Sequence, residues 1–89
     1  MRAVEERWIR EQRREEQSAL ELHRLAYVYY LNRLEERVRA GAPHAELVAI
    51  AVLCRRERAA YLQTTEAEAD AMHGGVIDVA RGLAEMETR

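Results

Sequence analysis

Two residues near the end of the sequence have the spacing of a metal site. Asp70 and His73 are three positions apart, so on a helix both side chains could face one ion. Di-iron carboxylate bundles use such an acid–histidine pair twice, with further glutamates from other helices. This sequence contains one such pair, and the alternative is that His73 marks the polar edge of the Gly74–Gly75 pair. We therefore expect no metal ligand and no cofactor, and nearly unchanged stability after Asp70→Ala.

Arginine clusters offer a second kind of chemistry, which is contact with a nucleic-acid backbone. All 14 basic residues are arginine, and six of them form two clusters. The clusters comprise Arg10, Arg13 and Arg14, and Arg55, Arg56 and Arg58. Glutamates interrupt both clusters and the formal net charge is −2, whereas backbone binding needs a net positive face. We expect a protein partner, and keep accessory nucleic-acid binding through these arginines as the alternative.

No stretch of the sequence has the pattern of a catalytic site. It contains no Gly-rich phosphate loop, no nucleophile elbow and no zinc motif. The one cysteine, Cys54, lies in the apolar run LVAIAVLC and is predicted to be a buried small hydrophobic residue. A single cysteine also excludes an intrachain disulfide. We expect no catalytic residue and no enzyme activity.

Glycine, proline and threonine divide the sequence into three expected helices. Gly41 suits a helix C-terminus, Pro43 suits the first turn of the next helix, and Thr65 with Glu68 forms a capping-box pattern. The expected helices cover residues 2–40, 43–63 and 65–87. They predict an all-α fold, a three-helix bundle or helical hairpin with one long N-terminal helix.

The long first helix has two unlike halves. Residues 10–17 read REQRREEQ and have no apolar member, so residues 1–18 are expected to form a charged arm and residues 19–89 the bundle core of one domain. In the second half, one face carries Leu20, Tyr27, Leu31, Leu34 and Val38. The opposite face carries Leu22, Leu25 and Tyr29. A helix that is apolar on two faces is expected to be covered on both sides.

The other two helices repeat this pattern less regularly. The second has one stripe of Leu47, Ile50, Ala51, Cys54, Tyr61 and Leu62, and a further stripe of Val48, Val52 and Ala59. The third has a coiled-coil-like seam of Met72, Val76, Val79, Leu83 and Met86. Because this seam keeps its phase across Gly74–Gly75, we favour one continuous helix with a weak point, while two shorter helices remain open.

The apolar residues left over by a small core predict binding to another protein. A chain of 89 residues buries only about 60% of its unfolded surface on folding, so a second copy or a hetero-oligomeric partner would enlarge its core. We expect a non-catalytic interaction module, an adaptor, regulator or chaperone-like subunit, that is cytoplasmic, has no membrane contact and forms a homodimer or a hetero-oligomer. The expected partner-binding residues are Val4, Trp8, Ile9, Leu22, Leu25, Tyr29 and Tyr30. A dimeric helical metal-binding protein is the third alternative.

Overall fold

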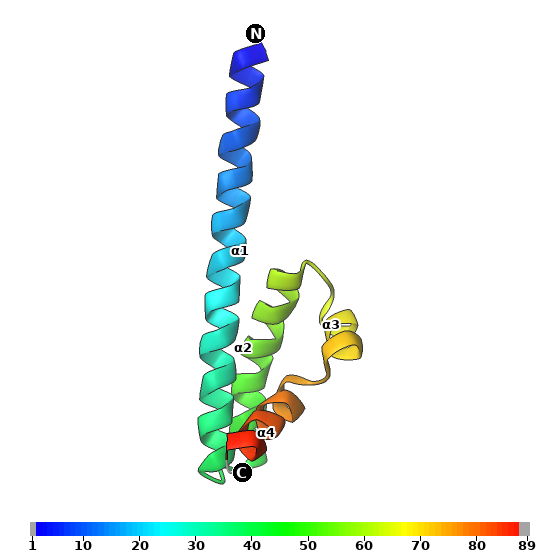
Figure 1. The fold of residues 1–89 in the computed structure, drawn as a ribbon. Helices are drawn as coiled ribbons and strands as arrows, with labels where there is room; N and C mark the ends of the chain where they lie inside the picture. Colours follow the sequence, from blue (N-terminus) through cyan, green and yellow to red (C-terminus); the bar gives the residue numbers. More distant parts are fainter. Residues whose placement is uncertain (1, 88–89) are drawn as a thin grey trace.

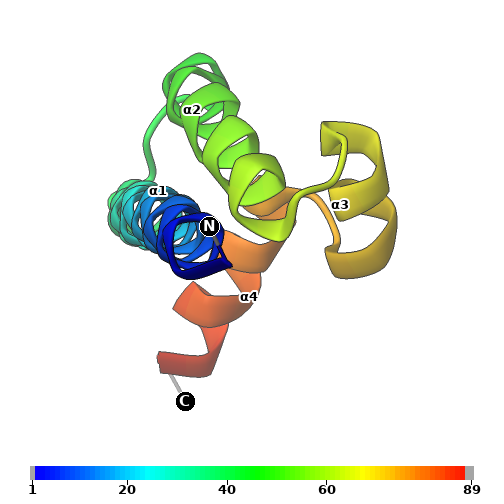
Figure 2. The same ribbon diagram turned by 90° about the horizontal axis from the view of Figure 1, so that it is seen from above.

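The protein is an all-α structure with one long N-terminal helix, as the sequence predicts. The computed structural model describes residues 2–87, with side chains from Glu5 onward. Its elements are α1 (Arg2–Arg39), α2 (His44–Leu62), α3 (Glu66–His73) and α4 (Val76–Glu87). α2 runs back along the C-terminal half of α1, and α4 packs on both (Figure 1). Seen along α1, these three helices surround the core, while α3 lies against α2 on the side away from α1 (Figure 2).

The turn between α1 and α2 follows from its glycine and proline. Gly41 has a φ of 71°, and its N–H donates to the Val38 carbonyl at 3.1 Å while the Ala42 N–H donates to the Arg37 carbonyl at 3.0 Å. These two bonds satisfy carbonyls that the end of a helix leaves open. Pro43 precedes α2 instead of lying in its first turn, so α2 begins at His44, one residue later than expected.

The core is small and lies between α1, α2 and α4. Its cluster of buried side chains contains one large residue from each helix, Leu34, Leu47 and Val76, and otherwise Ala51, Cys54 and Ala80. Tyr27, Leu31 and Val38 pack around this cluster, which confirms most of the predicted α1 seam. Cys54 is fully buried, as expected, and its Sγ donates to the Tyr27 carbonyl at 3.9 Å. Small residues in the core let the three helices approach closely.

The third expected helix, 65–87, is two helices, and the favoured continuous form is wrong. The predicted capping box is present, because the Glu68 N–H donates to Thr65 Oγ1 at 3.1 Å and the Glu68 carboxylate accepts from the Thr65 N–H. α3 then ends at Gly74, whose φ of 83° and ψ of 164° belong to a region that only glycine occupies readily. The chain turns there, and α4 starts a new direction toward α1.

The break also changes which residues of the third segment are buried. α4 buries Val76, Ala80 and Ala84, four positions apart, instead of the predicted seam through Val79 and Leu83. The two methionines of that seam, Met72 and Met86, are largely exposed. Two alanines on the buried face bring α4 close to α1, whereas longer side chains there would hold it away.

Candidate protein-interaction surface

An apolar stripe covers the side of α1 that faces away from α2 and α4. Leu22, Leu25 and Tyr29 succeed one another at spacings of three and four residues, so they share one face of the helix. Each is more than half exposed, although the predicted α1 seam on the opposite side is packed in the core. We call these three residues the outer face. Large apolar side chains that are exposed next to one another are typical of an interaction surface, whereas apolar residues exposed singly are common on any protein.

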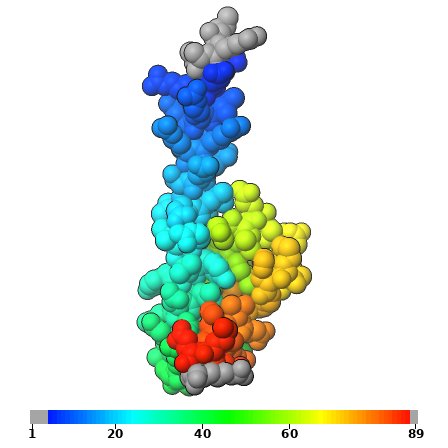
Figure 3. Space-filling view, viewed as in Figure 1, coloured from blue at the N-terminus to red at the C-terminus, as the bar shows by residue number. Residues whose placement is uncertain are grey.

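The N-terminal part of α1 stands clear of the other helices (Figures 1 and 3). Every residue from Glu5 to Ala19 is exposed, which agrees with the predicted arm. Opposite charges support the helix in this segment: Arg7 pairs with Glu11 at 3.5 Å, and Arg10 with Glu6 at 3.9 Å. Trp8, the one tryptophan in the chain, is 59% exposed on this arm.

The remaining predicted partner-binding residues lie elsewhere on α1. Ile9 is exposed on the arm, on the same side of the helix as Tyr27 and therefore away from the outer face. Tyr30 is half-buried and packs against the core, with its ring 5.4 Å from that of Tyr29 at an interplanar angle of 73°. The prediction for Val4 concerns a side chain outside the described residues. The structure thus brings Leu22, Leu25 and Tyr29 together, with Tyr30 touching Tyr29 from the core side and Ile9 on a different side of the helix.

A second group of exposed apolar residues lies on α2, and the sequence-based set of partner residues missed it. Val48, Val52 and Leu53 are each about two-fifths to half exposed. The sequence contains a signal for this group, because the run LVAIAVLC is apolar around the whole helix. Only one side of the helix can face the core, so some of these residues must stay exposed. These residues are smaller or better covered than those of the outer face. We therefore take the outer face as the principal candidate surface.

Polar side-chain contacts fix α2 against the flank of α1. His23 Nδ1 lies 2.6 Å from Glu57 Oε2 at one end, and the Arg37 Nε donates to Glu46 Oε1 at 2.6 Å at the other. The bond from Arg37 lowers the pKa of the Glu46 carboxyl, so this pair persists to lower pH than an unpaired glutamate would allow. Near the outer face, the bond from Arg24 lowers the pKa of Glu21 in the same way. The surface is therefore bordered by fixed charges.

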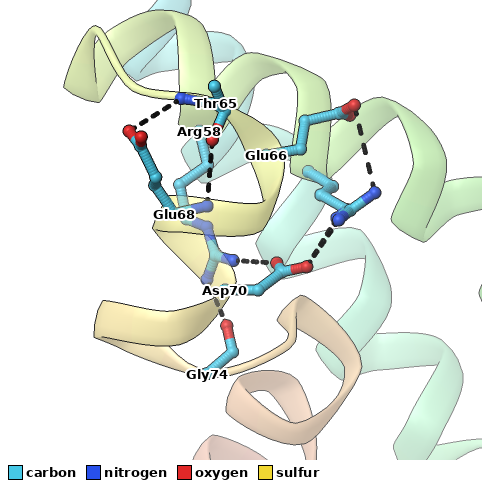
Figure 4. Close-up of polar contacts among 7 residues, drawn as sticks. Arg58, Thr65, Glu66, Glu68, Asp70 and Gly74 are labelled. Carbon is cyan, nitrogen blue, oxygen red and sulfur yellow. Dashed lines mark hydrogen bonds and ion pairs between the residues drawn. The ribbon is translucent and has the colours of Figure 1, made fainter.

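A buried arginine network occupies the region where a metal or a nucleic-acid contact was considered (Figure 4). Arg58 is 1% exposed; it donates to Asp70 Oδ1 at 2.6 Å and to the Gly74 carbonyl at 2.7 Å. Arg55 donates to the other oxygen of Asp70 at 2.7 Å and lies 3.9 Å from Glu66. This network ties α2 to α3 and to the break before α4.

These contacts change the interpretation of the Asp70–His73 pair and of the second arginine cluster. Both oxygens of Asp70 accept from arginine, while His73 is exposed, so the pair does not converge on an ion. Within the described residues, no group of three or more His, Cys, Asp or Glu side chains could hold a metal. Arg58 is buried, and Arg55, whose side chain is 40% exposed, is paired with Asp70 and Glu66, so the second arginine cluster is not a patch of three free surface arginines.

A cavity of about 370 Å³ lies beside the same network. Tyr27, Arg58, Tyr61 and His73 contribute its polar groups, with Leu62 and Val79 as apolar lining. Burial, the larger effect, raises the pKa of Tyr27, and the nearby Arg58 lowers it. The described residues that line the cavity include no serine, cysteine or carboxylate. We assign this cavity no chemistry.

The comparisons with known proteins leave the interpretation to the structure. Among residues 2–87, none of the helices combines the length and the apolar character that crossing a membrane requires. Searches of protein-family models, curated proteins and solved structures give no match to this chain.

Proposed function

We propose that the protein is a cytoplasmic, non-catalytic protein-interaction module, an adaptor, regulator or chaperone-like subunit, that binds its partner by helix packing on the outer face of α1. The observation that carries the proposal is the exposure of Leu22, Leu25 and Tyr29 on a helix whose other side is packed. Covering such side chains removes apolar surface from water, which is the main driving force of protein association.

Two features of the surface support a protein as the partner. Tyrosine and tryptophan are enriched at the energetically important centres of interfaces, and Tyr29 and Trp8 are both exposed on α1. Nucleic-acid binding has less support, because Arg55 and Arg58 of the second arginine cluster are held in internal ion pairs. Metal binding has less support because the same arginines occupy Asp70.

The proposal is tested by comparing two substitutions of equal exposure. Leu25 is 51% exposed on the outer face, and Val52 is 49% exposed on α2. Tagged wild-type protein, Leu25→Glu and Val52→Glu are used to capture proteins from a lysate of the native host. We expect the wild type and Val52→Glu to retain the same bound chain and Leu25→Glu to lose it. Equal retention by all three proteins would remove the outer face as the binding surface.

A further inference from the structure

Trp8 on the arm and the outer face of α1 lie on one heptad seam, whose three intervening positions are polar. From Trp8 through Ser18 to Tyr29, seam positions alternate at spacings of three and four residues, which is the spacing of a coiled coil. Trp8 lies at the arm end of this seam, and Leu22, Leu25 and Tyr29 lie at the bundle end. The seam is on the side of α1 opposite the core, so no helix of the same chain among the described residues covers it.

We infer that the outer face of α1 is covered by the arm of a second copy of this chain, packed antiparallel, with Trp8 of each copy against Leu25 of the other. This inference rests on the proposed function and names the partner. In this arrangement the two seams meet about a twofold axis near residues 16 and 17. Because the arm extends beyond the bundle of its own chain (Figure 1), this arrangement puts the two bundles at opposite ends of the paired helices, where they do not obstruct each other.

Charge and side-chain type favour this register. With Trp8 opposite Leu25, the flanking position places Arg14 of one copy opposite Glu21 of the other, and it does so twice by symmetry. Shifting the antiparallel pair by one heptad in either direction places Trp8 opposite Asn32 or Ser18 instead. Within these choices, the proposed register alone gives the tryptophan an apolar seam partner.

The parallel arrangement is disfavoured by the same seam. Side-by-side parallel helices would place Glu11 against Glu11 and Glu15 against Glu15 of the second copy, which sets like charges together at the interface. In the antiparallel arrangement Glu11 lies opposite Leu22, where its methylene groups can pack while its carboxylate reaches the rim, and Glu15 lies opposite Ser18. Ala26, next to Leu25, leaves room for the indole ring.

A disulfide formed only across the interface tests this geometry. Full-length Trp8→Cys and Leu25→Cys are mixed and oxidised mildly. In the mixed dimer the two new thiols meet at one end, and the native Trp8–Leu25 contact remains at the other end. Cys54 stays out of the reaction, because it is fully buried and burial raises its pKa to about 11. We expect a mixed disulfide dimer, several-fold more abundant than either self-linked dimer.

Matched controls separate this outcome from chance collision. Arg10 is also exposed on the arm but lies off the seam, so Arg10→Cys mixed with Leu25→Cys should give little disulfide. A Trp8→Cys protein that links efficiently to itself would establish a parallel pair and overturn the inference. A wild-type protein that sediments as a monomer would also overturn the inference. A mixture that gives no mixed disulfide would do the same. If the lysate experiment still shows a partner lost only by Leu25→Glu, the proposed function stands and the second copy alone is excluded.

Discussion

At the scale of single residues, the most consequential group is the buried guanidinium of Arg58. A charged group removed from water is costly unless hydrogen bonds and an opposite charge compensate it. Here Asp70 supplies the charge and Gly74 a carbonyl, and together they connect α2 to α3 and to the break before α4. The network therefore stabilises a particular arrangement of α2, α3 and α4, and its value depends on every partner being present.

The contacts of Asp70 contradict the expectation that Asp70→Ala leaves stability nearly unchanged. Removing this carboxylate leaves Arg58 buried with one carbonyl partner, and we expect the free energy of unfolding to fall by about 2 kcal/mol. The decrease in unfolding free energy is limited to this size because the side chain of Asp70 is 31% exposed, so water weakens its interaction with Arg58. Asp70→Asn keeps a hydrogen-bond acceptor, so its stability should lie between that of the wild type and that of Asp70→Ala.

Urea unfolding of the three proteins, followed by circular dichroism, measures the difference. Glu36→Ala, an exposed acidic position on α1, serves as a control and should change stability by less than about 0.5 kcal/mol. Equal stability of Asp70→Ala and the control would show that the network contributes nothing to folding.

Part of this residue-level arrangement could be predicted from the sequence. Arg58 follows Ala51 and Cys54 by seven and four positions, so it lies on the same buried face of α2. That spacing indicates a buried arginine, although its position in a basic cluster suggested a solvent-exposed one. Its partner could not be predicted in the same way. Asp70 reaches Arg58 because α3 folds back onto α2, and that placement depends on tertiary packing.

At the scale of elements, local signals determined helix ends better than helix continuity. Gly41 and the Thr65–Glu68 pair act through neighbouring residues alone, and both end or begin a helix as predicted. The Gly74–Gly75 pair costs a helix roughly 1 kcal/mol per glycine, which weakens the helix without deciding where it ends. The packing of Val76 and Ala80 against the core decides it, and sequence spacing carries little information about that contact.

Gly41 and Gly82 allow the effect of backbone conformation on stability to be tested without a change in side-chain packing. A Cβ built on Gly41 or on Gly82 meets no atom within 4 Å, so an alanine fits in both places. Gly82 lies inside α4, where alanine should raise the free energy of unfolding by about 0.5–1 kcal/mol. Gly41 has a φ of 71°, where alanine should lower it by about 1 kcal/mol.

Chemical denaturation of Gly41→Ala and Gly82→Ala measures both changes against the same wild type. Because the substitution and the surrounding space are alike, the difference in sign reports the backbone alone. Changes of the same sign at the two positions would contradict the helix C-terminus assigned to Gly41.

At the scale of the whole molecule, the chain consists of a short bundle and a helix that extends well beyond it. The molecule measures 60 Å along its longest axis and 23 Å across (Figure 3). The sequence predicted this division from the polar run at residues 10–17, because such a run has no apolar side to bury. It could not show which side of α1 stays uncovered, since both sides are apolar and only the placement of α2 and α4 distinguishes them.

Deleting residues 1–17 separates the contribution of the arm to folding from its contribution to association. The shortened chain begins at Ser18 with Glu21 three residues later, a sequence suited to start a helix. Since residues 5–19 are exposed, the bundle should lose less than about 1 kcal/mol of unfolding free energy in dilute solution. The full-length protein should melt at a temperature that rises with protein concentration, because association stabilises the folded state, and the shortened chain should not.

Leu25→Glu in the full-length chain is the matched reference for this deletion. It keeps the arm and removes both Trp8–Leu25 contacts of the proposed dimer, so it too should melt independently of concentration. A shortened chain that fails to fold at any concentration would show that the arm stabilises the bundle directly. A concentration dependence that survives the deletion would place the contact between copies elsewhere, with the exposed residues Val48, Val52 and Leu53 of α2 as the remaining apolar surface of comparable size.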